Sequence, residues 1–177
     1  MRIKNRDMIA KPTGPGVPGY YQKYIDLIAE DDLLLALEAG RAKTKQLIRE
    51  LSESQLHIAY APGKWTIAQV LLHIMDTERV FSYRALAFVR GDQNALPGFD
   101  ENAYAANDFS RQRTIKDVLQ EYEAVRQATL ALFGHASGSA LDVIGHANGI
   151  GVSPRAIGWM IAGHEAHHCK VIRERYL

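Results

Sequence analysis

Apolar side chains recur at steps of three and four residues in four stretches of this chain, which is the spacing of the buried face of an amphipathic helix. The stretches cover residues 33–51, 67 to about 90, 115–134, and 154 nearly to the carboxyl terminus. No segment alternates convincingly between apolar and polar residues, as a half-buried strand would. Four amphipathic helices of roughly 20 residues each predict an all-α fold, a four-helix bundle.

Residue types at the ends of these stretches agree with helix boundaries. Suitable N-caps precede them, namely Asp31 or Asp32, Thr66, Thr114 and Ser153. Gln69, three residues after Thr66, completes a capping box, and Pro154 occupies a first helical position that proline favours. Gly134 is predicted to end the third helix in a left-handed conformation, which glycine adopts without strain.

The remaining segments predict an arm, a single bundle domain and two connections. Residues 1–19 contain the tract KPTGPGVPG and predict an extended N-terminal arm, and residues 20–177 are expected to form the domain, with a short helix within 20–28. Residues 91–113 make a long loop between the second and third helices, and we expect it to be ordered and packed on the bundle. Residues 135–152 contain Asn-Gly, a tight-turn dipeptide, so a short hairpin is one candidate there.

Composition excludes several classes of protein. The 177 residues include 21 Lys and Arg against 20 Asp and Glu, and this balance argues against a nucleic-acid binder, which needs clustered cations. No apolar run approaches the roughly 18 residues of a membrane span, and no apolar signal segment opens the chain, so a cytoplasmic location is expected. With one cysteine and seven histidines, any metal site is expected to use histidine ligands.

Two histidines occupy the apolar face of the last predicted helix. His164 and His168 continue the stripe that begins at Ile157 and Ile161, and four-residue spacing places both imidazoles on one face, within reach of one metal ion. His73 lies at the edge of the apolar face of the second predicted helix. Each histidine could instead be a core residue that hydrogen-bonds a neighbour, but three from two facing helices predict a metal site with an open coordination position.

Four polar residues near these histidines are candidates for supporting the site. Gln69 and Asp76 flank His73, and Glu165 and His167 lie between the other two histidines. Asp76 or Glu165 could orient a ligand or move a proton, but an exposed helix charge is the favoured interpretation for both. His167 is expected at the helix surface or beside the site.

The segment from His164 to His168 also matches H-E-x-x-H, the zinc-peptidase motif in which the glutamate acts as a base. Only nine residues follow His168, and they contain no histidine for the usual third ligand. A peptidase is therefore a minor alternative.

Three separated motifs, GKWTIAQVLLHIMDTERV, LPGFDENAYA and VSPRAIGWMIAGHEAHHCKVIRERY, resemble the DinB/YfiT-like superfamily of metal-dependent enzymes over residues 63–176. The resemblance implies a four-helix bundle, often a homodimer, whose metal is held by one histidine of the second helix and two of the fourth. Those positions correspond to His73, His164 and His168. Members of the superfamily include transferases that use low-molecular-weight thiols such as bacillithiol, and mycothiol-dependent isomerases.

The resulting hypothesis is a metal-dependent enzyme that binds zinc or nickel and transfers a low-molecular-weight thiol to a small-molecule substrate. A hydrolase of a small substrate is the first alternative, because a divalent ion can activate either a thiol or water. A metal-binding or stress-response module without turnover is the second. Neither a nucleic acid nor a membrane is expected as a partner.

Overall fold

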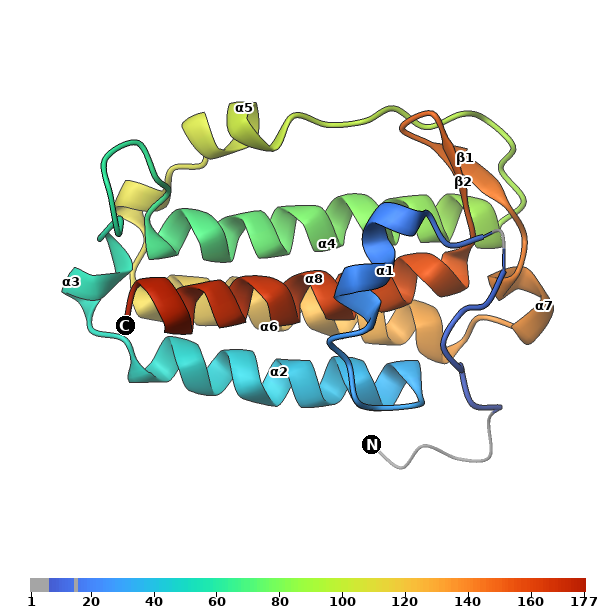
Figure 1. The fold of residues 1–177 in the computed structure, drawn as a ribbon, viewed down its shortest axis with the longest axis horizontal. Coiled ribbons are helices and arrows are strands. Elements are labelled where there is room, and N and C mark those ends of the chain that lie inside the picture. Colours follow the sequence, from blue (N-terminus) through green and yellow to red (C-terminus); the bar gives the residue numbers. More distant parts are fainter. Residues whose placement is uncertain (1–6, 15) are drawn as a thin grey trace.

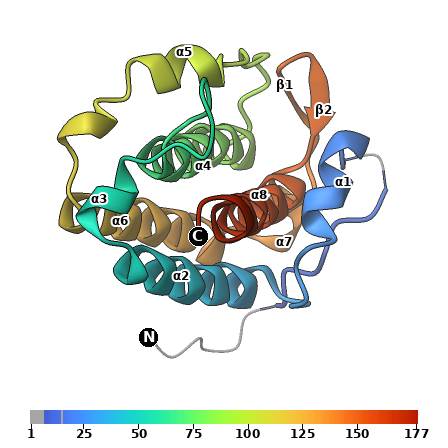
Figure 2. The same ribbon diagram turned by 60° about the vertical axis from the view of Figure 1, so that its left-hand side comes forward.

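The protein is a bundle of four long helices, seen in a computed structural model that describes residues 7–14 and 16–177. In chain order the elements are α1 (Gly19–Ile25), α2 (Leu33–Glu50), α3 (Glu53–Leu56), α4 (Ile67–Val89), α5 (Glu101–Ala106), the 3-10 turn η1 (Ser110–Gln112), α6 (Ile115–Gly134), α7 (Gly138–Leu141), β1 (Gly145–Ala147), β2 (Ile150–Val152) and α8 (Pro154–Arg175). Helices α2, α4, α6 and α8 run along the long axis, and the shorter elements lie around them (Figure 1 and Figure 2). The predicted all-α four-helix bundle is confirmed.

The predicted caps begin the long helices. The Asp32 carboxylate accepts the first free amide N–H groups of α2, and the Ser153 hydroxyl does the same for α8. Thr66 and Thr114 each form a complete capping box, the first of them with Gln69 as predicted. Caps of this kind typically contribute about 1 kcal/mol each to stability.

Gly134 does not adopt the left-handed conformation that the sequence predicted. It is the last residue of α6, and His135 follows it as the C-cap with φ −121°. The Nδ1 atom of His135 lies 2.9 Å from the carbonyl oxygen of Ala131. The imidazole is therefore a hydrogen-bond partner for one of the last carbonyl groups of the helix. A glycine in the left-handed conformation would otherwise let backbone N–H groups bond to those carbonyls.

The long loop between α4 and α6 is ordered, as predicted, and it carries α5 and η1. It runs back along the outside of α4 (Figure 1). The N–H of Leu96 donates to the carbonyl of His146 at 2.9 Å, and the N–H of Asn148 donates to the carbonyl of Leu96 at 3.0 Å. Farther along, Nε2 of Gln69 donates to the carbonyl of Ala105 at 2.9 Å. The loop is thus joined to the hairpin at one point and to α4 at another.

The hairpin considered for residues 135–152 is present. Strands β1 and β2 pair antiparallel, with Gly145 opposite Val152. The turn between them is formed by Asn148 and Gly149, whose φ angles are 52° and 75°. Two positive φ angles match a two-residue hairpin turn with the twist that antiparallel strands favour.

The described part of the N-terminal arm, residues 7–14 and 16–18, contains no helix or strand and lies against the bundle. Ile9 is buried in the core, and its carbonyl accepts a hydrogen bond from the N–H of Leu33 at 3.0 Å. Nε1 of Trp159 donates to the carbonyl of Ala10 at 3.0 Å. Residues 1–6 and 15 of the predicted arm lie outside the described residues.

Apolar side chains fill the bundle in two clusters, one toward each end. One includes Leu33, Phe88 and Trp159, and the other includes Leu47 and Ile74. Burying a large apolar side chain stabilises the fold by about 1.5–3 kcal/mol relative to exposure. Within residues 7–14 and 16–177, no helix is long and apolar enough to cross a membrane.

A layer of buried polar side chains separates the two clusters at the middle of the bundle. Each long helix contributes to it: Thr44 from α2, Glu78 from α4, Arg126 from α6, and His164 and Glu165 from α8. Buried polar groups are costly unless they find partners. The buried ionisable and polar side chains of the four long helices therefore meet near the middle of the bundle.

Candidate metal centre

The three histidines predicted to bind a metal converge between α4 and α8. One ring nitrogen from each of His73, His164 and His168 lies within 4.8 Å of the corresponding nitrogens of the other two. The Nε2 atoms of His73 and His164 are 3.0 Å apart. His164 is buried, and the other two are half-buried. The site therefore has a closed side within the bundle and an open side.

Close packing of α1 on α8 shapes the open side. A Cβ atom at Gly163 would collide with the carbonyl group of Tyr24, so only glycine lets the two helices approach this closely. The aromatic ring of Tyr24 then lies 6.2 Å from the ring of His164 and 5.0 Å from the ring of His167, measured between centroids. Trp65 contacts the site from the other side, with its ring 5.0 Å from that of His73.

Burial keeps the three imidazoles neutral. It lowers the pKa of His73 and lowers that of His164 well below its usual value, where the neighbouring histidines add to the effect. Burial, followed by the fields of His73 and His167, lowers the pKa of His168 to about 3. Neutral imidazole has a free nitrogen lone pair, which is the form that binds a metal.

The donor set fits a divalent transition ion. A tetrahedral zinc ion with Zn–N bonds of 2.0–2.1 Å places its ligand atoms about 3.3 Å apart. The separations here, 3.0 Å for one pair and at most 4.8 Å for the others, lie on either side of that value. Three imidazoles leave at least one coordination position for another molecule, as in catalytic rather than structural zinc sites.

Three of the four supporting candidates lie near the histidines but make other contacts. Gln69 caps α4 and binds the α5 loop, so both ends of its amide are engaged. Asp76 pairs with Arg79 at 3.3 Å, while burial raises the pKa of the Asp76 carboxyl. His167 packs its ring against Tyr24 and His168.

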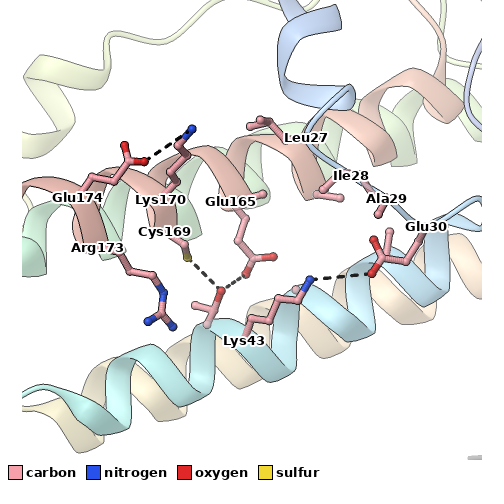
Figure 3. A pocket seen from close by; sticks show the side chains of 15 residues that line it. Leu27, Ile28, Ala29, Glu30, Lys43, Glu165, Cys169, Lys170, Arg173 and Glu174 are labelled. Carbon is pink, nitrogen blue, oxygen red and sulfur yellow. Dashed lines mark hydrogen bonds and ion pairs between the residues drawn. The ribbon is translucent and has the colours of Figure 1, made fainter.

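The interpretation of Glu165 as an exposed helix charge is wrong. Its side chain is 2% exposed and points from α8 toward α2, as Figure 3 shows. Its carboxylate accepts hydrogen bonds from Thr44 Oγ1 at 2.9 Å, from the hydroxyl of Tyr122, and from Arg126 Nη1 at 2.9 Å. The carboxylate fits here because residue 40 of α2 is glycine. A Cβ atom at that position would overlap the carboxylate. Engaged in this way, Glu165 does not serve as the base that a peptidase would need.

Sequence reasoning missed the buried ion pairs that hold this carboxylate. Arg126 is fully buried and binds Glu78 through two hydrogen bonds of 2.8 Å, besides its bond to Glu165. Burial alone would lower the pKa of Arg126, but Glu165 and Glu78 outweigh it and hold that pKa well above its usual value. A signal existed, because Arg126 lies four residues after Tyr122 on the apolar face of α6.

One cavity of the described residues lies away from the histidines. It has a volume of about 400 Å³ and lies between α2 and α8 (Figure 3). Charged side chains at its rim pair with one another, Lys43 with Glu30 and Lys170 with Glu174. Among residues 7–14 and 16–177, no group of three potential metal ligands opens into it. The three histidines line a smaller cavity instead.

That smaller cavity has a volume of about 280 Å³ and includes all three histidines in its wall. Most of its other lining side chains are aromatic, from α1, α4 and the loops: Tyr20, Tyr21, Tyr24, Trp65, Phe81 and Phe99. Phe99 belongs to the long loop, so the loop contributes to the wall of the site. The cavity suits a small molecule with apolar surface.

A helical bundle that directs three neutral imidazoles from two helices into a cavity has the architecture that helix-bundle metalloproteins use. The chain belongs to the DinB superfamily, whose family model matches residues 36–172. This confirms the resemblance found in the sequence and extends it to most of α2.

Two curated relatives are named as candidate metal-dependent hydrolases. YfiT of Bacillus subtilis (strain 168) is 30% identical over 76 residues, which are 43% of this chain and 43% of YfiT. A protein of Geobacillus thermodenitrificans (strain NG80-2) is 28% identical over 116 residues, which are 63% of this chain and 65% of the relative. The chain thus matches less than two thirds of the length of either relative.

Two solved structures share the fold. The structure of YfiT from Bacillus subtilis, described as a probable metal-dependent hydrolase with an unusual four-helix bundle topology, aligns with a TM-score of 0.72 at 20% identity over 93% of this chain and 91% of that one. A mycothiol-dependent maleylpyruvate isomerase aligns with a TM-score of 0.65 at 13% identity over 78% of this chain and 58% of that one. The metal-dependent relatives and the histidine cluster together support a divalent metal.

Proposed function

We propose that this protein is a metal-dependent enzyme in which His73, His164 and His168 bind one divalent transition ion, zinc or nickel. The observation that carries the proposal is the convergence of three neutral imidazoles in the wall of an aromatic cavity. A bound ion of this kind supplies Lewis acidity, which lowers the pKa of a thiol or a water molecule beside it. The protein's part is to hold the ligands, position the substrate and exclude bulk water.

For the reaction we propose transfer of a low-molecular-weight thiol, of the bacillithiol or mycothiol type, to a small electrophile. The thiol sulfur forms a bond to carbon, the leaving group departs with its electron pair, and the thiol proton passes to solvent. The chain's own cysteine does not supply the thiol, because Cys169 lines the other cavity and contacts Thr44. Burial also raises the pKa of the Cys169 thiol to about 12. The thiol must therefore arrive with a cosubstrate.

Hydrolysis is the second candidate, favoured by the names of the two curated relatives. Many hydrolases use a side-chain base in addition to a metal. Among the described residues that line the histidine cavity, Glu101 is the one carboxylate, and it is exposed on α5. Glu165, the acidic residue next to His164, binds Arg126 on the far side of α8. The lack of a buried carboxylate among the described residues of this cavity supports thiol transfer over hydrolysis.

Turnover assays separate the candidates. The metal-loaded protein is incubated with a small thiol and a chlorinated aromatic electrophile, and separately with an ester and no thiol. We expect a thiol conjugate that forms only with metal and that the variant His168→Ala fails to make. Ester turnover without thiol would support hydrolysis instead, and metal binding without either reaction would leave a non-catalytic metal-binding module.

The matched control is His146→Ala, which removes an exposed histidine of β1 and should keep wild-type turnover. Equal losses in His146→Ala and His168→Ala would contradict a specific role for the histidine cluster.

A further inference from the structure

The wall of the histidine cavity also contains a cationic side chain, that of Arg84. It is 7% exposed and follows His73, Thr77 and Phe81 along the face of α4 that lines the cavity. Eleven residues separate it from His73, so the two Cα atoms are about 16 Å apart along the helix and on nearly the same side of it. The cavity therefore has the histidines at one end of this face and a guanidinium at the other.

Within the described part of the chain, the charge of Arg84 has no counter-ion. Among residues 7–14 and 16–177, no carboxylate lies within 4.0 Å of its guanidinium, whereas Arg126 has two such partners. Nη2 of Arg84 donates to the carbonyl of Pro97 at 2.8 Å, and the guanidinium carbon lies 5.6 Å from the centroid of the Phe81 ring. Buried charges are normally paired, because removing them from water is costly.

An unpaired hydroxyl lies between the two ends of the cavity. Thr77 is 3% exposed, lines the cavity, and its Oγ1 atom has no hydrogen-bond partner among the described residues. A buried hydroxyl without a partner is uncommon in folded proteins. Both polar groups on this face of α4 are thus available to a ligand, and aromatic rings form the opposite walls.

We propose that Arg84 binds the carboxylate of the substrate and that Thr77 hydrogen-bonds a polar group between that carboxylate and the reactive end. The inference rests on the proposed function in taking this cavity as the substrate site. It defines the substrate class as small carboxylates with an apolar, ring-containing body. The planar guanidinium suits a carboxylate, which it can bind through two parallel hydrogen bonds. Glu101, exposed at the same cavity, disfavours ligands with several negative charges.

Fluorescence of Trp65, which lines the cavity, can follow binding; Trp159, the other tryptophan, is fully buried. The probes are 4-phenylbutyrate, its neutral amide and the matching phosphonate, titrated into the full chain with and without metal. We expect the carboxylate to bind the metal-free protein about ten-fold or more tightly than the amide. Tighter binding of the phosphonate than of the carboxylate would overturn the carboxylate assignment.

Variants assign the preference to Arg84. Arg84→Gln should reduce the ratio of acid to amide affinity to near one, and Arg84→Lys should retain part of it. Thr77→Val should leave the affinity for both probes unchanged, because neither carries a polar group between its ring and its carboxyl end. The control is Arg90→Gln, which removes an exposed cation at the end of the same helix and should leave the ratio unchanged. Arg84 also contacts the loop at Pro97, so thermal unfolding of each variant checks that a change in affinity does not come from loss of that contact.

Two outcomes overturn the inference: equal binding of acid and amide, or a preference that survives in Arg84→Gln. A preference that appears only with metal and survives in Arg84→Gln would place the carboxylate at the histidines instead. If the protein binds no metal but keeps an Arg84-dependent preference, the proposed enzyme function fails while this anion site stands.

Discussion

Two sets of ionisable side chains are buried side by side at the middle of the bundle, and they avoid the cost of burial in different ways. The histidines of the cavity remain neutral. Arg126 remains charged and is compensated by Glu78 and Glu165. Because Glu165 is adjacent to His164, and Glu78 shares α4 with His73, the ion pairs fix the helices that carry the ligands.

Replacing Arg126 by Met should therefore destabilise the protein strongly. The change leaves two buried carboxylates without their cation, and breaking a buried pair in this way costs about 3–5 kcal/mol. Urea denaturation gives the free energy of unfolding. The control is Arg41→Met, because Arg41 is a partly exposed partner of Glu38 and Glu123, and its loss should cost no more than about 1 kcal/mol. Equal losses in the two variants would contradict the account.

The neutral histidines predict how the metal-free protein responds to acid. Their folded pKa values are lowered, so the unfolded chain binds more protons below its own histidine pKa of about 6.5. The stabilisation is complete above that pH and is lost as the pH falls from there toward about 3, the folded value of His168. Urea denaturation of the protein in the presence of a metal chelator should give a free energy of unfolding that decreases from pH 7 to pH 6 and again to pH 5.

The double variant His164→Gln with His168→Gln is the control for that experiment, and it should show a weaker pH dependence over the same range. An unchanged dependence would mean that other groups are responsible.

At the scale of the elements, the cavity depends on how closely α1 packs on α8. Gly163 allows this contact, and any side chain there meets the backbone of Tyr24. Gly163→Ala should displace α1 and cost about 1–3 kcal/mol, as overpacking generally does. Thermal unfolding measures the loss, and limited proteolysis should show faster cleavage near α1. Gly138→Ala on α7, where a Cβ meets nothing within 4 Å, should be neutral or slightly stabilising.

The sequence predicted elements best where the signal is local. Apolar spacing and caps such as Thr66 gave the four long helices, and the spacing of His164 and His168 with His73 gave the cluster. Signals that depend on a distant partner were missed or misread. The orientation of Glu165 follows from Arg126 on another helix and from the missing side chain of Gly40, neither of which periodicity reveals. Gly134 was misread because a side chain, His135, covers the helix end.

At the scale of the whole molecule, the bundle is a rigid frame with one side closed by packed core and the other covered by α1 and the long loop. Metal binding should stabilise this frame, because a ligand that binds only the folded state adds about 2.7 kcal/mol at a concentration 100-fold above its dissociation constant. The melting temperature should therefore rise on adding zinc or nickel to the metal-free protein. A rise of the same size in the variant His73→Ala would show that the ion binds elsewhere.

The central claim is that His73, His164 and His168 form a metal site, and the metal content of the chain purified without a histidine tag tests it most directly. Elemental analysis should find close to one transition-metal ion per chain in the wild type and in His146→Ala. The variants His73→Ala and His168→Ala should lose most of it. A wild-type protein without bound transition metal, or undiminished metal in the two cluster variants, would contradict the account.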